Sequence, residues 1–200
     1  MAQHALLRIL SKEEYLAAQG DHWPYLFLVV EGELEAVKVS AEGRSLIVTT
    51  FARGDIFWGP AFFETDLSLP VSLEANQPTT VALWSRSSLD PLLAKGGIGW
   101  ALARLMLQYM WRANVLLERL VFQPVTARLA RLLLDHFQST ASPTLPRTLT
   151  LDDMAARIGT TREVVCRTLY DLADRHIIDV TRTELVLMDR DSLVKLAEGT

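Results

Sequence analysis

The chain has 200 residues, a formal net charge of −4 and a hydrophobic content of 50%. Charged residues make up 22% of the sequence, as in ordinary folded domains, which excludes a largely disordered chain. The apolar stretches are too short to cross a bilayer and the first residues do not resemble a signal peptide, so we expect a soluble cytoplasmic protein with no membrane partner. The single cysteine, Cys166, excludes an intramolecular disulfide and a metal site built from several thiolates.

Short β-rich runs occupy the first half of the chain. We expect strands at residues 25–30, 33–39, 44–50 and 79–85, with glycine-containing turns between them. Turn signals at intervals of about 8–12 residues are typical of a sandwich or barrel. Because residues 25–85 contain no histidine, a metal site of the kind found in other small barrels is not expected.

The same region is rich in aromatic side chains. Two interpretations are open for Trp58, Phe62, Phe63 and Trp84: they fill the core, or they line a pocket for an apolar or aromatic effector. A third alternative is that no small-molecule effector exists and the protein is active as synthesised. The sequence does not separate these alternatives, so the effector is unknown.

A helical pattern replaces the β-rich one from Ile98 to Phe122. Apolar residues recur there every three or four positions, at Leu102, Met106, Tyr109, Ala113, Leu116 and Leu120. Further apolar residues lie off this stripe, so the predicted helix has more than one apolar face. The stripe either packs on the chain's own β-rich domain or meets its twin in a homodimer, and we assign it to dimerisation.

The most informative pattern lies in the last third of the chain. Thr150 with Asp153 three positions later predicts a capped helix that ends at Gly159, after which either Thr160 or Thr161 caps a second helix. Two short helices joined by a glycine-containing turn are the helix-turn-helix signature, in which the second helix enters the major groove of DNA. Two β-rich runs within residues 177–187 predict a hairpin wing behind it.

Arg162, Glu163 and Arg167 lie on the side of this second helix that faces away from its apolar residues. Arginine can donate two hydrogen bonds to guanine and glutamate can accept one from the cytosine amino group, so the three are candidate base readers. The alternative is a surface ion pair between Glu163 and Arg167, four residues apart. Cys166 lies among them, and a small side chain next to DNA explains it more simply than a redox switch.

The chain also contains the segments FLVVEGELEAV, FARGDIF, VTARLARLLLDHF and TREVVCRTLYDLADRHII, in this order. Together they resemble the cyclic-AMP receptor protein / fumarate-nitrate reductase regulator superfamily of transcription factors. The resemblance implies an α+β fold in three parts. These are an N-terminal β-roll of the jelly-roll type in residues 1–97, a long dimerisation helix in residues 98–123 and a C-terminal winged helix-turn-helix in residues 124–200.

The resemblance further implies a bacterial transcription regulator that binds an inverted repeat in double-stranded DNA as a homodimer and contacts RNA polymerase. DNA phosphates would then be contacted by Thr150, Thr160, Thr161 and Arg182. An enzyme is not expected, because the sequence contains no catalytic motif. The alternative function is a ligand-binding or protein-interaction module whose DNA-binding domain has degenerated.

The β-roll departs from the pattern of the superfamily's cyclic-nucleotide binders. Those proteins hold the ribose with a glutamate and the cyclic phosphate with an arginine, whereas this chain has Pro60 and either Pro70 or Val71 there. Burying a phosphate without a cation is costly, so control by cyclic AMP is not expected. Nor are an iron–sulfur cluster, a haem or any other cofactor, because the only cysteine is Cys166 and the only histidines of the β-roll, His4 and His22, precede its predicted strands.

Overall fold

The computed structural model describes residues 5–94, 97–140, 142–146 and 149–199. They divide into two compact units, one formed by Met1–Gly43 and Ile47–Ala113 and the other by Arg44–Leu46 and Asn114–Thr200. The division falls inside the long helix α2 (Gly97–Phe122), so each unit includes one part of this helix.

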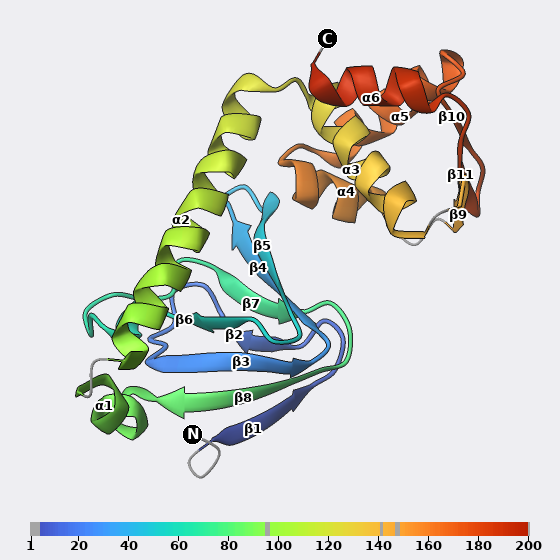
Figure 1. Cartoon of the computed structure of the whole chain (residues 1–200). Helices are drawn as coiled ribbons and strands as arrows, with labels where there is room; N and C mark the ends of the chain where they lie inside the picture. Colours follow the sequence, from blue (N-terminus) through green and yellow to red (C-terminus); the bar gives the residue numbers. More distant parts are fainter. Residues whose placement is uncertain (1–4, 95–96, 141, 147–148, 200) are drawn as a thin grey trace. The chain divides into compact units, whose positions relative to one another are not determined.

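The first unit is a β-roll made of two antiparallel sheets, each with four strands among the described residues (Figure 1). One sheet has the order β1-β8-β3-β6, with strands Leu6–Leu10, Thr79–Ser85, Tyr25–Glu31 and Ile56–Trp58. The other has the order β2-β7-β4-β5, with strands Tyr15–Ala17, Ser72–Ala75, Glu33–Val39 and Ser45–Ala52. Gly32 makes the tight turn between β3 and β4 at a φ of +85°, a conformation that other residues rarely adopt.

Apolar residues of both sheets meet in one core. Its fully buried members include Leu10, Phe27, Leu34, Phe51, Leu73 and Val81. The predicted strands at residues 25–30, 33–39, 44–50 and 79–85 are confirmed as β3, β4, β5 and β8. Strands β1, β2, β6 and β7 were not predicted, because strands of three to five residues contain too little alternation to stand out.

A second apolar cluster joins the β-roll to three helical segments. These are the short 3-10 helix η2 (Pro60–Phe62), α1 (Arg86–Ala94) and the first part of α2. The cluster contains Leu26, Trp58, Phe62, Ala82, Trp84, Leu89 and Leu102. The N-terminal part of α2 is therefore anchored to the β-roll by side-chain packing.

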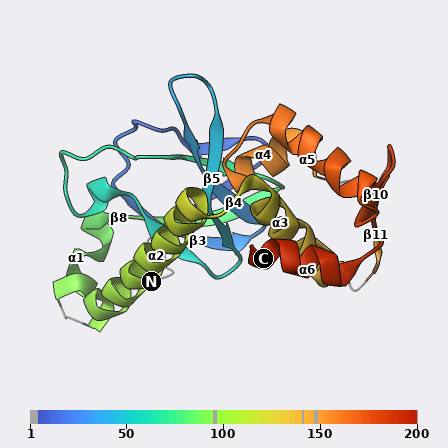
Figure 2. The same ribbon diagram turned by 90° about the horizontal axis from the view of Figure 1, so that it is seen from above.

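The second unit is a winged helix-turn-helix. Its helices are α3 (Val125–Thr140), α4 (Leu151–Ile158), α5 (Arg162–Asp174) and α6 (Arg190–Glu198). Figures 1 and 2 show α6 lying beside α3. The wing is an antiparallel sheet of three described strands in the order β10-β11-β9, which are Ile178–Val180, Glu184–Leu187 and Thr144–Pro146.

The α+β fold expected from the sequence, with a β-roll, a long helix and a C-terminal winged helix-turn-helix, is confirmed. Helix α6 and strand β9, which completes the wing, were not predicted. No helix within the described ranges has an apolar stretch long enough to span a membrane.

Candidate nucleic-acid interface

Two local features set the geometry of the helix-turn-helix. Thr150 Oγ1 accepts a hydrogen bond of 3.1 Å from the N–H of Asp153, whose carboxylate accepts one of 2.9 Å from the N–H of Thr150. This is the predicted capping box at the start of α4. Gly159 ends α4 at a φ of +66°, and a Cβ there would lie 2.5 Å from Leu120 Cδ2. The glycine thus permits both the turn into α5 and the close approach of α2.

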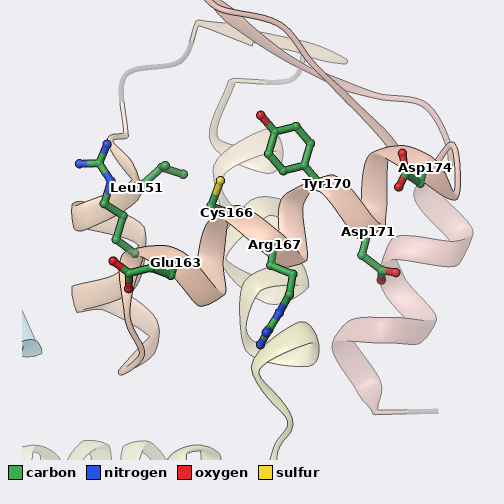
Figure 3. Close-up of a pocket in the computed structure, with 8 residues that line it drawn as sticks. Leu151, Glu163, Cys166, Arg167, Tyr170, Asp171 and Asp174 are labelled. Carbon is green, nitrogen blue, oxygen red and sulfur yellow. The ribbon is translucent and has the colours of Figure 1, made fainter.

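Helix α5 has one buried and one open side. The buried side packs into the core of the second unit through Val165, Leu169 and Leu172. The open side carries the three candidate base readers, Arg162, Glu163 and Arg167. They line a groove of 740 Å³ together with Leu151, Cys166, Tyr170, Asp171 and Asp174 (Figure 3). The sequence prediction that these three side chains share an accessible surface is therefore met by the geometry.

Charge is unevenly distributed along this groove. Both arginines lie in the first half of α5, whereas Asp171 and Asp174 lie near its end. In Figure 3, Cys166 and Tyr170 project from one side of α5 and Arg167 and Asp171 from the other. A polyanion would be attracted to the N-terminal half, where the helix dipole also favours negative charge.

Arg162 pairs with a carboxylate of the preceding helix. Its Nη1 lies 2.9 Å from Oδ2 of Asp152, on α4. The alternative that the sequence left open, an ion pair between Glu163 and Arg167, does not occur, because Arg167 has no hydrogen-bond or ion-pair partner among the described residues. Sequence reasoning missed Asp152, since only the turn between α4 and α5 brings these positions together.

Glu163 is positioned to accept hydrogen bonds. Three neighbouring groups lower the pKa of the Glu163 carboxyl group: the backbone N–H of Glu163, the hydroxyl of Thr161 and the charge of Arg162. The side chain is therefore ionised near neutral pH and acts only as an acceptor, which is what the cytosine amino group requires. Sequence reasoning also missed Tyr170, although it follows Cys166 by four positions and so had to share its face of α5.

The predicted phosphate contacts lie at helix starts and in the wing. Thr150 and Thr161 are the N-caps of α4 and α5, Thr160 precedes the second cap, and Arg182 is exposed between β10 and β11. The hydroxyl of Thr150 also donates to Asp153 at 2.7 Å, so its backbone N–H and hydroxyl are both used within the cap. Contact of these residues with DNA stays a prediction.

Most of the predicted dimerisation stripe contacts its own chain, and the role of the stripe in dimerisation stays a prediction. Leu102 is buried against the β-roll, and the Tyr109 hydroxyl donates a hydrogen bond of 2.6 Å to the Ile56 carbonyl. Further along, Leu116 and Leu120 line a cavity of the second unit. These four side chains therefore face their own chain, and of the predicted stripe only Met106 and Ala113 are exposed.

A different stripe of α2 is open. Its exposed apolar members are Trp100, Leu107, Met110, Leu117 and Val121. They follow one another at intervals of seven, three, seven and four residues, so they keep the heptad spacing on another face of the helix. Both faces of α2 repeat with the same period, so the spacing alone does not say which of them a second copy would contact.

The aromatic residues assigned to an effector pocket are mostly core. Trp58, Phe62 and Trp84 are at most 6% exposed and pack with Leu26 and Leu89. Phe63 alone of the four is exposed, and its ring contacts those of Trp58 and Phe62. This packing favours the first of the alternatives left open by the sequence.

A second aromatic group lies inside the β-roll, where Tyr109 of α2 meets three phenylalanines, Phe27, Phe51 and Phe57. Neighbouring ring centroids in this group are 4.8–5.8 Å apart. Burial, helped by the Asp55 carboxylate, raises the pKa of Tyr109 to about 12. Within the described parts of the chain, no three His, Cys, Asp or Glu side chains are grouped so that they could hold a metal ion.

Comparison with known proteins identifies both parts of the chain. Residues 7–95 match the family model of the cyclic nucleotide-binding domain, and residues 127–196 match that of the Crp-like helix-turn-helix domain. The protein belongs to the cyclic-AMP receptor protein / FNR superfamily. Members of this superfamily are transcription regulators and not enzymes, so this chain is a DNA-binding regulator.

The relatives compared below share only about a fifth to a quarter of their residues with this chain. The CRP-like cAMP-activated global transcriptional regulator of Mycobacterium tuberculosis is 23% identical over 186 residues, which are 90% of this chain and 83% of the relative. A transcriptional regulator of the crp/fnr family from Eubacterium rectale has a TM-score of 0.83 at 19% identity, covering 98% and 91% of the two chains. The c-di-GMP responsive global regulator CLP of Xanthomonas campestris has a TM-score of 0.82 at 20% identity, covering 92% and 94%.

Proposed function

We propose that this superfamily member binds an inverted repeat in double-stranded DNA sequence-specifically, as a homodimer, in the cytoplasm. The observation that carries the proposal is the open side of α5, where Arg162, Glu163 and Arg167 line one groove while the opposite side is buried. Two such helices would enter successive major grooves, about 34 Å apart along the duplex. A net charge of −4 is no obstacle, because attraction of phosphates depends on local cations, here Arg162 and Arg167 in the first half of α5. Action on RNA polymerase follows from the superfamily and is part of the proposal.

The dimer contact that we propose is the open stripe of α2, from Trp100 to Val121. Its members are between 56% and 76% exposed in the single chain. Apolar side chains that repeat every three or four residues on a helix are buried when a second helix packs alongside. A second copy of α2 would supply that partner with the same spacing.

We further propose that cyclic AMP does not control this protein, although the M. tuberculosis relative is named as cAMP-activated. Val71 is buried in the β-roll core, and Pro60 is the first residue of η2. Neither side chain can donate a hydrogen bond or carry a charge, so neither can hold a ribose hydroxyl or a cyclic phosphate. The rings of Phe27, Phe51, Phe57 and Tyr109 occupy the space between the sheets and α2.

The DNA proposal is tested by selecting bound sequences from random double-stranded DNA, with purified protein and no added ligand. We expect an enriched inverted repeat, and we expect the double variant Arg162→Ala/Arg167→Ala to enrich nothing. Equal enrichment by the double variant would contradict the assignment of α5 as the reading helix. If neither protein enriches a sequence, with or without cell extract, the degenerate-module alternative is supported instead.

Oligomeric state tests the dimer contact. We expect the full chain to have the mass of a dimer by light scattering and the variant Leu117→Glu to have that of a monomer. Gln108→Glu is the matched control, because it introduces the same carboxylate at an exposed position of α2 outside the open stripe. A dimeric Leu117→Glu variant would contradict the proposed contact.

Calorimetric titration with cyclic AMP tests the effector proposal separately. We expect no saturable heat of binding at up to millimolar nucleotide. A one-to-one binding isotherm would contradict it without affecting the DNA proposal.

A further inference from the structure

A small cavity of the second unit has four arginines among its ten lining residues. It has a volume of 110 Å³ and is bounded by the C-terminal part of α2, by α3 and by the end of α4. Its charged lining residues are Arg119, Arg128, Arg131, Arg157 and Asp135. Since one water occupies about 30 Å³ in the liquid, the cavity has room for roughly three to four waters, which suits one small oxyanion.

The charges around this cavity do not balance. Three guanidinium groups, those of Arg119, Arg128 and Arg131, face one carboxylate, whereas Arg157 already interacts with another group. Asp135 makes no ion pair with any residue that the structure describes. Asp135 follows Arg131 by four residues, which is the less favourable order for an ion pair on a helix. Even with Asp135 paired to one of these three arginines, the lining would keep an excess of two positive charges.

Arg128 and Arg131 play different parts in the lining. The guanidinium of Arg128 is held by hydrogen bonds of 2.8 Å to the Ile158 carbonyl and 2.6 Å to the Gln123 carbonyl, and burial lowers its pKa. Arg131 is half-buried and makes no hydrogen bond or ion pair within the described part of the chain. A partly desolvated cation without a partner is unfavourable, and an anion in the cavity would supply one.

The rest of the lining strengthens such an interaction. Leu116, Leu120, Leu132 and Ile158 form the apolar part of the wall. Apolar neighbours exclude water and so reduce the screening of charges. None of the lining residues is shared with the groove on α5, so the cavity is separate from the candidate DNA-reading surface.

We propose that this cavity is a binding site for one small oxyanion of the phosphate or sulfate class. Arg131 and Arg119 are its principal ligands, and Arg128 forms a fixed part of the wall. The oxyanion is either a free ion or the terminal phosphoryl group of a small molecule. The site does not depend on the proposed DNA-binding function, since no residue of the α5 groove takes part.

The experiment is a titration of the full chain with inorganic phosphate at constant ionic strength, followed by phosphorus NMR or calorimetry. We expect saturable binding with one phosphate per chain. Arg131→Gln should weaken it at least tenfold, because a charge-assisted hydrogen bond is lost, and Arg131→Lys should restore most of the affinity. Arg190→Gln is the matched control and should leave binding unchanged, because it removes the same charge from an exposed position on α6.

Two results would overturn the proposal. One is the absence of saturable binding, and the other is equal weakening by Arg131→Gln and Arg190→Gln. Loss of binding in Arg162→Gln but not in Arg131→Gln would place the phosphate in the α5 groove, which also refutes the cavity site. Thermal unfolding of each variant establishes that it is folded, and Arg119→Gln serves as the second test position. Pyrophosphate in a parallel titration distinguishes the two sources, because only a phosphoryl-group site should accept the larger anion.

Discussion

Arg128 Nε donates a hydrogen bond of 2.8 Å to the carbonyl of Ile158, the last residue of α4. Through Nη1 the same guanidinium donates to the carbonyl of Gln123 at 2.6 Å and to that of Leu120 at 3.4 Å. Carbonyls at a helix end have no donor within the helix. One side chain of α3 therefore satisfies the ends of two other helices and joins the end of α2 to the helix-turn-helix.

Replacing this residue should destabilise the second unit. We expect Arg128→Leu to lower the free energy of unfolding by about 1–3 kcal/mol, because half-buried carbonyls lose their donors. Urea unfolding followed by circular dichroism measures the change. Arg131→Leu is the control, since it removes the same charge from the same helix without breaking a described hydrogen bond. Equal losses in the two variants would show that these hydrogen bonds contribute nothing specific.

The turn between α4 and α5 gives a second prediction, which compares two glycines. Both glycines have a positive φ, which is strained for alanine. A Cβ at position 159 would also lie against Leu120, whereas a Cβ at position 199 would have no heavy atom within 4 Å. Left-handed strain costs about 1–2 kcal/mol in both variants, and overpacking adds about 1–3 kcal/mol to the first. We expect thermal unfolding to show the larger loss for Gly159→Ala. Matching losses would mean that Leu120 moves aside at no cost.

The base-reading residues predict changes in DNA specificity. Arg162→Ala and Arg167→Ala should each weaken binding to the selected operator by about 1–3 kcal/mol and relax discrimination at one base pair. Fluorescence anisotropy with operator variants measures both effects. Arg175→Ala is the control, because Arg175 pairs with Asp171 at the far end of α5 and should change neither. Unchanged discrimination in both arginine variants would remove them from the list of base readers.

Asp152 should act on DNA recognition through Arg162, with which it pairs at 2.9 Å. We expect Asp152→Asn to reduce discrimination at the base pair read by Arg162, because the guanidinium is no longer held in one orientation. Discrimination at the base pair read by Arg167 should not change. Binding to non-specific DNA should strengthen slightly, since a negative charge near the phosphates is removed. The same operator panel, measured at two salt concentrations, separates these effects, and a uniform change across all positions would contradict a positioning role.

The Tyr109 phenol predicts a pH dependence for the first unit. Its folded-state pKa of about 12 lies above the ordinary value of 10.0, so the protonated form is favoured by folding. The stabilisation of the folded state that results from this raised pKa is fully present below pH 10 and is lost as the pH rises through 12. We expect the unfolding free energy of the wild type to fall more steeply between pH 10 and 12 than that of Tyr109→Phe. Parallel curves for the two proteins would contradict the assignment.

Local signals in the sequence determined the helix-turn-helix and two strands of the wing, but not α6 or β9. These signals act over a few residues, so they can be predicted without knowledge of the fold. They are the capping box of Thr150 and Asp153, the helix end at Gly159 and the apolar face of α5. The longer strands of the β-roll could be predicted as well, because their alternating pattern is also local. Arg162, Glu163 and Arg167 could be placed together because the period of the helix alone brings them onto one side.

The tertiary structure alone decided which side of α2 faces the chain. Leu102 and Tyr109 lie seven residues apart, as do Met110 and Leu117, so periodicity defines two stripes but not which one is covered. The neighbours that cover a stripe come from distant segments such as the β-roll and α3. Two further features could not be predicted from the sequence, because their contacts exist only once separate helices have packed. These are the pairing of Arg162 with Asp152 and the cavity around Arg131.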